Sequence, residues 1–190
     1  MMGVNNRHEN APSRSSENGF TMIELLIAMA MSTIVLTAVI ALYSGLTRSY
    51  TTETARAAAQ QDLRAALSLM CEDIRHAGLD PLGTAGGGIT MTSATDITFT
   101  ADLDYDGAVT AGNNEQIRYY LNGNELWQEV DGGSGAILLD NVTALSFTGL
   151  SDDGGATIST VVISMTVQAP AGRQGNVTRA LTERARLRNM

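Results

Sequence analysis

The hydrophobic residues of this chain are distributed very unevenly along its length. Residues 1–19 are polar and rich in turn formers, a composition that buries too little apolar surface to fold. A run without any charged side chain then extends from residue 25 to residue 47, and Glu24 is the charge nearest to its start. We therefore expect a polar leader over residues 1–19, followed by a long apolar helix.

The apolar run is long enough to cross a lipid bilayer. At about 1.5 Å per residue it forms a helix of roughly 35 Å, whereas the hydrocarbon core is about 30 Å thick. A secretory signal peptide is the competing interpretation, but its apolar stretch is usually only about 7 to 15 residues long and is cut on its far side. We predict one transmembrane segment over residues 20–45.

Beyond Gly45 the pattern becomes that of an amphipathic helix over residues 46–78. Apolar positions recur at helical spacings, with arginine and glutamate between them. Gly78 and Pro81 supply a stop, so we expect one helix from Phe20 to Ala77, with Gly45 as a place where it can bend. The amphipathic half of this helix is unstable alone unless its apolar stripe packs against another element, so we expect the rest of the chain to supply a covering sheet. The predicted apolar stripe consists of Leu46, Tyr50, Ala57, Leu63, Leu67, Met70, Ile74 and Ala77.

Residues 79–190 have the alternating pattern of β-strands, joined by short turns without intervening helices. This arrangement predicts antiparallel pairing. We expect strands over 96–100, 117–121, 125–127, 136–150, 161–167 and 177–187. Asn122-Gly123 predicts a hairpin turn with positive φ at both residues, and Trp127 is expected to pack in the core. The predicted fold class is α+β, with a long N-terminal helix packed against a C-terminal antiparallel sheet.

Composition argues against several classes of chemistry. The net charge is −8, and all 12 basic residues are arginines. The absence of lysine excludes a P-loop lysine and Schiff-base chemistry and disfavours nucleic acid as a partner. Cys71 is the single cysteine, and no histidine follows His76, so a disulfide, a cysteine-rich zinc site or a histidine-based triad is not expected. We expect a small buried or half-buried Cys71 and a protein that is not an enzyme.

Glu24 is an unusual residue for the start of an apolar helix. A carboxylate inside lipid costs about 2.5 to 3.5 kcal/mol, so such a residue usually has a partner. A cationic amino group at the start of the same helix is the nearest candidate, and the helix dipole favours the negative side chain there. The alternative is a glutamate that reaches the membrane interface and has no further role.

The junction Gly19-Phe20-Thr21-Met22-Ile23-Glu24 resembles the type IV prepilin signature. The resemblance implies that a membrane prepilin peptidase cuts between Gly19 and Phe20 on the cytoplasmic side and that Phe20 is then N-methylated. It also implies that Glu24 pairs with the N-terminus of a neighbouring subunit during filament assembly.

Four further segments together resemble PilW-type minor pilins, which are relatives of the J-type pseudopilins of type II secretion. The segments are 73–81, the acidic loop after Phe99, 114–119 and 177–189. The resemblance implies a pilin fold and a subunit that initiates or caps a type IV pilus or pseudopilus, with other pilins as partners. It places the helix in the bacterial inner membrane and the sheet in the periplasm, an orientation that the arginines on the two sides of the span do not decide.

The acidic loop has the spacing of the first half of an EF-hand calcium loop. Asp102, Asp104 and Asp106 alternate before Gly107, and the carbonyl of Ala108 adds a ligand position. The twelfth position, where calcium loops have a bidentate glutamate, is Asn113, and Glu115 lies two residues beyond it. Calcium is therefore the candidate cofactor, bound with modest affinity, and a solvated acidic turn is the alternative.

Two functions remain open at this point. The first is a structural pilin or pseudopilin subunit, which needs the free amine at Phe20 and the carboxylate of Glu24. The second is a membrane-anchored periplasmic binding module with a calcium-stapled loop, which tolerates any apolar residue at these two positions.

Overall fold

The structure is a computed structural model that describes residues 19–152 and 157–189. The predicted leader therefore lies outside the described residues, except for Gly19. The chain divides into two compact units, one up to Gly45 and one from Leu46 onward. Helix α1 (Met22–His76) runs through both. The predicted long N-terminal helix is confirmed.

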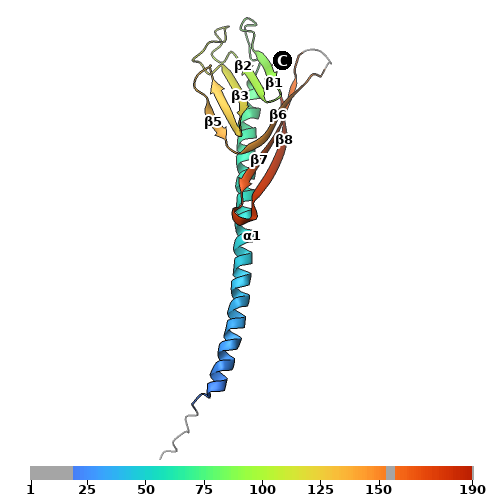
Figure 1. Cartoon of the computed structure of the whole chain (residues 1–190). Coiled ribbons are helices and arrows are strands. Elements are labelled where there is room, and N and C mark those ends of the chain that lie inside the picture. The colour runs from blue at the N-terminus through green and yellow to red at the C-terminus, as the bar shows by residue number, and fades with distance from the viewer. Residues whose placement is uncertain (1–18, 153–156, 190) are drawn as a thin grey trace, which may run out of the picture. The chain divides into compact units, whose positions relative to one another are not determined.

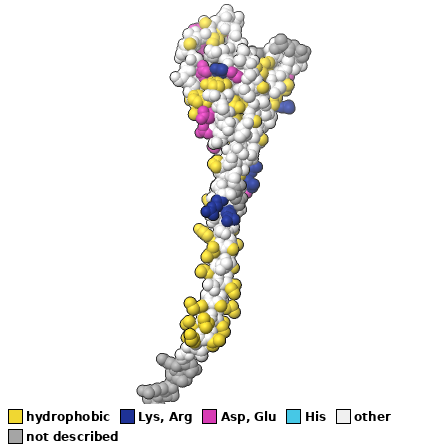
Figure 2. All heavy atoms as spheres, viewed as in Figure 1, with side chains coloured by type: hydrophobic (Ala, Val, Ile, Leu, Met, Phe, Trp, Pro, Cys, Tyr) yellow, Lys and Arg dark blue, Asp and Glu magenta, His cyan; other side chains and the backbone are white. Residues whose placement is uncertain are grey.

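In the first unit the large apolar side chains are all exposed, from Phe20 just before α1 to Tyr43 within it. Figure 2 shows these side chains covering the apolar part of the helix. By length and composition, α1 is the one helix among the described residues that can span a membrane. Such a surface needs lipid or other helices around it, since hydrocarbon side chains are unfavourable in water.

In the second unit, two antiparallel sheets lie along α1 (Figure 1). Sheet A has five strands in sequential order, and sheet B has three. The short helix η1 (Gly172–Gln174) connects the last two strands. Sheet A consists of β1 (Gly88–Ser93), β2 (Asp96–Thr100), β3 (Gln116–Asn122), β4 (Glu125–Val130) and β5 (Ala136–Leu139), and sheet B of β6 (Val142–Leu150), β7 (Thr160–Pro170) and β8 (Asn176–Arg186).

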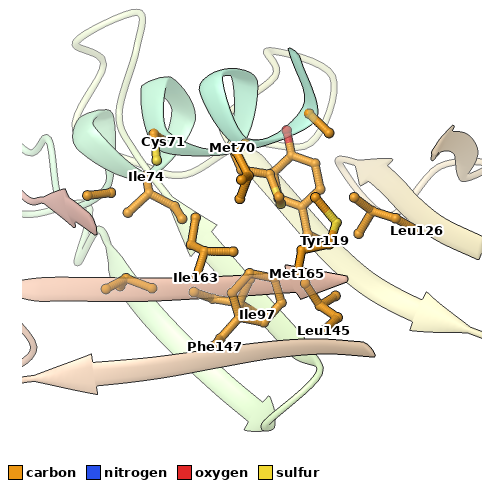
Figure 3. Packing of buried hydrophobic residues seen from close by; sticks show 14 of the residues in the cluster. Met70, Cys71, Ile74, Ile97, Tyr119, Leu126, Leu145, Phe147, Ile163 and Met165 are labelled. Carbon is orange, nitrogen blue, oxygen red and sulfur yellow. The ribbon is translucent and has the colours of Figure 1, made fainter. Parts of the chain in front are cut away.

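Both sheets share one hydrophobic core with α1. Figure 3 shows Met70 and Ile74 of the helix beside Tyr119 of sheet A and Ile163 of sheet B. Every second residue of β7 from Val161 to Val167 is buried, as period-two alternation predicts for a strand with one face on the core. The α+β fold class predicted from the sequence is confirmed. Strand β1 was not predicted.

The buried stripe of α1 begins later than the sequence pattern predicts. Leu46 and Tyr50 are exposed, and so is Ala57. The first buried helix positions are Thr52 and Ala59, because the sheets reach only as far as this part of the helix. From Leu63 onward the predicted stripe is confirmed. Cys71 is also buried, as expected, and burial is the main cause that raises the pKa of its thiol.

The extended stretch predicted over residues 136–150 is two strands in different sheets. Strand β5 ends at Leu139 and β6 begins at Val142, so the chain passes from sheet A to sheet B through Asp140 and Asn141 alone. Asn141 has a φ of 59°, a left-handed conformation that asparagine adopts more readily than most residues. This local reversal ends one strand and starts the next.

Two details of the β3–β4 hairpin differ from the prediction. Asn122 pairs with Glu125, so the central turn residues are Gly123 and Asn124, and only Gly123 has a positive φ, of 61°. A single positive φ at the first central residue is typical of a type II′ turn. Trp127 lies on the outer face of sheet A and stacks on Tyr120, because its neighbour Leu126 takes the inward, fully buried position.

Candidate functional site

Thr21 caps the N-terminus of α1. Its Oγ1 accepts a hydrogen bond from the backbone N–H of Glu24 at 3.3 Å and donates one to Glu24 Oε2 at 3.5 Å. A threonine followed three residues later by a glutamate has the spacing of a capping box, in which the two residues satisfy the free N–H groups of the first helical turn. The spacing is visible in the sequence, where Thr21 and Glu24 are three residues apart.

The cap fixes the position of the Glu24 carboxylate at the start of the apolar helix. Glu24 is in the first turn of α1, where the helix dipole favours a negative charge. It lines one side of a shallow hollow on the helix surface together with Phe20 and the small residues Ala28 and Ser32. The carboxylate is therefore held next to the residue that the prepilin signature makes the mature N-terminus.

The acidic loop between β2 and β3 brings the three predicted aspartates together. Each offers a carboxylate oxygen, and these oxygens lie within 4.8 Å of one another. Asp102 is fully buried, and its two oxygens accept the backbone N–H groups of Asp106 and Gly107 at 3.2 and 3.0 Å. Asp106 in turn accepts the N–H of Ala108 at 2.9 Å. The backbone N–H groups of the loop thus point toward the carboxylates of the same loop.

Glu115 holds this loop through three hydrogen bonds to its backbone. Its Oε1 accepts the N–H groups of Leu103 and Asp104 at 2.9 and 3.3 Å, and its Oε2 accepts that of Thr110 at 2.7 Å. These bonds, led by that of Thr110, lower the pKa of Glu115. Glu115 lies two residues beyond the position where a calcium loop has its bidentate glutamate. In this structure its carboxylate binds backbone N–H groups of the loop.

Asp131 closes the other end of the loop. Its oxygens accept the N–H groups of Gly112, Asn114 and Gln116 at 3.0, 2.7 and 3.1 Å. Burial acts to raise the pKa of Asp131, but these hydrogen bonds outweigh it and the net shift is downward. No local pattern indicates this role, because Asp131 lies after β4 and reaches the loop only through sheet pairing.

The donor set fits a hard cation such as calcium. Calcium takes oxygen ligands at about 2.3 to 2.6 Å, so two ligands on one ion are at most about 5 Å apart, and carboxylate oxygens keep a second lone pair when they accept one N–H. The pKa of Asp104 is raised, first by desolvation and then by the negative charges of Asp106, Glu115 and Asp102. A cation would relieve that repulsion.

The exposed apolar helix with its capped, carboxylate-bearing start, joined to a head of antiparallel strands, defines a type IV prepilin-like protein. The prokaryotic N-terminal methylation motif matches residues 14–40, which include the junction at Gly19 and Phe20. The chain belongs to the family described as prepilin peptidase-dependent protein B, which matches residues 52–187. No curated protein and no solved structure matches the chain. The resemblance to a minor pilin is confirmed, and prepilin peptidase is a partner of this protein.

Proposed function

We propose that this chain is a structural minor pilin subunit that is drawn into a type IV pilus or a type II secretion pseudopilus. The observation that carries the proposal is the capped carboxylate of Glu24 at the start of an apolar helix segment whose large side chains are all exposed up to Tyr43. In the proposed sequence of events, the peptidase cuts between Gly19 and Phe20, Phe20 is methylated, and residues 20–45 hold the subunit in the inner membrane with its head in the periplasm. Other pilin subunits are the partners of the helix.

The chemistry of the mature N-terminus supports this role. Cleavage creates a cationic amine one residue before the cap, and a carboxylate in an apolar environment needs such a partner. Thr21 already holds Glu24 at the helix start, so the carboxylate is positioned to receive the amine of an adjacent subunit. This pairing would set the axial position of one helix against the next.

Mass spectrometry of the protein isolated from its native membranes tests the proposal. We expect a chain that begins at a methylated Phe20. A chain that retains the leader, or begins at another residue, would contradict it and would favour the second candidate, a membrane-anchored binding module.

The proposal assigns no reaction to the protein. His76 is the only histidine among residues 19–152 and 157–189, and it is exposed at the end of α1. Cys71 is buried and its thiol pKa is raised, the opposite of what a nucleophilic thiol requires. The families that match this chain are structural, which agrees with this inference.

We further propose that Asp102, Asp104, Asp106 and the carbonyl of Ala108 bind calcium and stiffen the loop of the head. The convergence of the three carboxylates supports this. Calorimetric titration of the protein with calcium, together with a thermal-shift measurement, tests it. We expect binding and a higher melting temperature at millimolar calcium, and Asp104→Asn should weaken both. The absence of heat and of any shift would identify the loop as a solvated acidic turn.

A further inference from the structure

Helix α1 separates two grooves of opposite charge in the unit that begins at Leu46. Asp62, Leu63 and Arg64 are consecutive, and successive helix residues are rotated by about 100° around the axis. Leu63 is fully buried against the sheets. Asp62 and Arg64 therefore leave the helix on opposite flanks, Asp62 toward β5 and Arg64 toward β8.

The acidic groove lies between α1 and the edge strand β5. Asp62 and Asp140 line the same cavity of about 500 Å³, together with Ile137. Both aspartates are exposed, and Ile137 is 47% exposed at the free edge of sheet A. Within the described ranges neither aspartate has a hydrogen bond or an ion pair. This edge thus presents one large exposed apolar side chain, that of Ile137, beside unpaired carboxylates.

The basic groove lies between α1 and the edge strand β8. Arg64, Ser68 and Arg75 of the helix and Glu183 of β8 line a cavity of about 250 Å³ over the buried side chains of Leu67 and Cys71. Both arginines are exposed, and in the described part of the chain neither guanidinium has a hydrogen bond or an ion pair. The groove therefore offers two cations, which outnumber the single carboxylate of Glu183, around an apolar floor.

The same division of charge extends over both sheets. Residues 88–140 contain nine acidic residues and one arginine, whereas residues 160–189 contain five arginines and one glutamate. Figure 2 shows acidic side chains on the side where Figure 1 labels β5, and arginines on the side where it labels β8. The chain thus carries both halves of a complementary contact, and complementary charge guides partner choice.

We propose that the β5 edge of one copy of this chain, with Ile137 and Asp140, docks into the groove between α1 and β8 of a second copy. Asp140 then pairs with Arg64 or Arg75, whose guanidinium groups suit a carboxylate, and Ile137 covers the apolar floor. Because the two surfaces differ, the contact is heterologous and repeats from copy to copy without closing. The inference rests on the proposed function in that assembled subunits lie side by side.

Cysteine cross-linking of the full-length protein in membranes tests this contact. The chain has one cysteine, so Cys71→Ala gives a background without thiols. Ser68→Cys in one tagged copy and Asn141→Cys in a second, differently tagged copy place thiols beside the groove and beside Asp140 while all charges remain. We expect a disulfide between the two tags on oxidation, and a ladder of species when one chain carries both cysteines.

Charge reversal identifies the occupant of the groove. Arg75→Glu in the first copy or Asp140→Arg in the second should each lower the cross-link yield about fivefold, and the two combined should restore it. Arg56→Glu is the matched control, because Arg56 lies on the same helix but pairs with Glu53, and it should leave the yield unchanged.

Failure of restoration, or cross-links to another protein only, would overturn the proposal. The mature N-terminus of the same samples is read separately by mass spectrometry. A chain that begins at methylated Phe20 but gives no cross-link would sink this contact and leave the pilin function intact.

Discussion

The phenolic oxygen of Tyr119 donates a hydrogen bond to Asp73 Oδ2 across 2.6 Å, and this contact joins α1 to the middle of sheet A. The same oxygen accepts a hydrogen bond from Gln128 Nε2 at 2.9 Å. Burial is the main cause that raises the pKa of both Asp73 and Tyr119. The helix and the sheet are therefore connected by a polar contact inside an otherwise apolar core.

Tyr119→Phe removes the hydroxyl group, so the Asp73 carboxylate loses the hydrogen bond that Tyr119 donates. We expect the free energy of unfolding to fall by about 1 to 3 kcal/mol, the cost of an unsatisfied buried polar group. Urea unfolding of the fragment from residue 46 onward measures the change. Tyr120→Phe, on the outer face of the same strand, is the control and should change stability by less than about 0.5 kcal/mol. Equal effects of the two variants would show that the bond to Asp73 contributes nothing.

Acid should weaken the head through Glu115. Because the folded pKa of this residue is below the ordinary value of 4.5, its ionised form stabilises the fold above that pH. This contribution is lost as the pH falls through the folded pKa. Glu115→Gln should lower the melting temperature at pH 7 and flatten its decline between pH 5 and pH 3. If the melting temperature of the variant declined between pH 5 and pH 3 as steeply as that of the parent protein, the prediction would be wrong.

Asp73 should act with the opposite sign. Its folded pKa is above the ordinary value of 3.8, so its contribution to stability is complete below that value and is lost as the pH rises through the folded pKa. We expect Asp73→Asn, which keeps an acceptor for Tyr119, to be relatively more stable at pH 7 than at pH 3 when compared with the parent protein. Melting curves at the two pH values measure this difference, and its absence would mean that Asp73 titrates alike in both states.

Glu24→Ala should leave cleavage and membrane insertion intact and reduce incorporation into filaments severalfold. The physical reason is that the variant keeps the apolar helix but loses the carboxylate that the neighbouring amine requires. Quantitative blotting of sheared filaments against membranes measures the effect. Glu53→Ala, which removes an exposed carboxylate farther along the same helix, is the control. Normal incorporation of the Glu24 variant would rule out the role.

The local hydrophobic pattern of the sequence predicted which segments form helices and strands more accurately than it predicted how those elements pack. The helix, β2, β7 and β8 follow from periodicity and stop signals within single segments. Periodicity does not show how far the sheets extend along α1, so the exposure of Tyr50 was missed. A shift of one residue also moves a side chain to the other face of a strand, which is why Trp127 was expected in the core where Leu126 takes the buried position.

The residues of the two candidate sites also fall into those that local sequence spacing predicts and those that only the folded structure reveals. The prepilin junction and the aspartates at 102, 104 and 106 depend on spacing within a few residues, so they are visible in the sequence. The anchoring roles of Glu115 and Asp131 depend mostly on contacts 11 to 19 residues away, those of Glu115 with Leu103 and Asp104 and those of Asp131 with the end of the loop. Those contacts exist only after β2, β3 and β4 have paired, and no local pattern announces them.

The passage of the chain between the sheets through Asp140 and Asn141 has a thermodynamic consequence. A link of two residues leaves too little slack for one sheet to separate while the other keeps its place over Met70 and Ile74. The head should therefore melt as one cooperative body, with a calorimetric enthalpy equal to the van't Hoff enthalpy. The two sheets should therefore unfold together, so a destabilising substitution at the edge of one sheet also lowers the stability of the other.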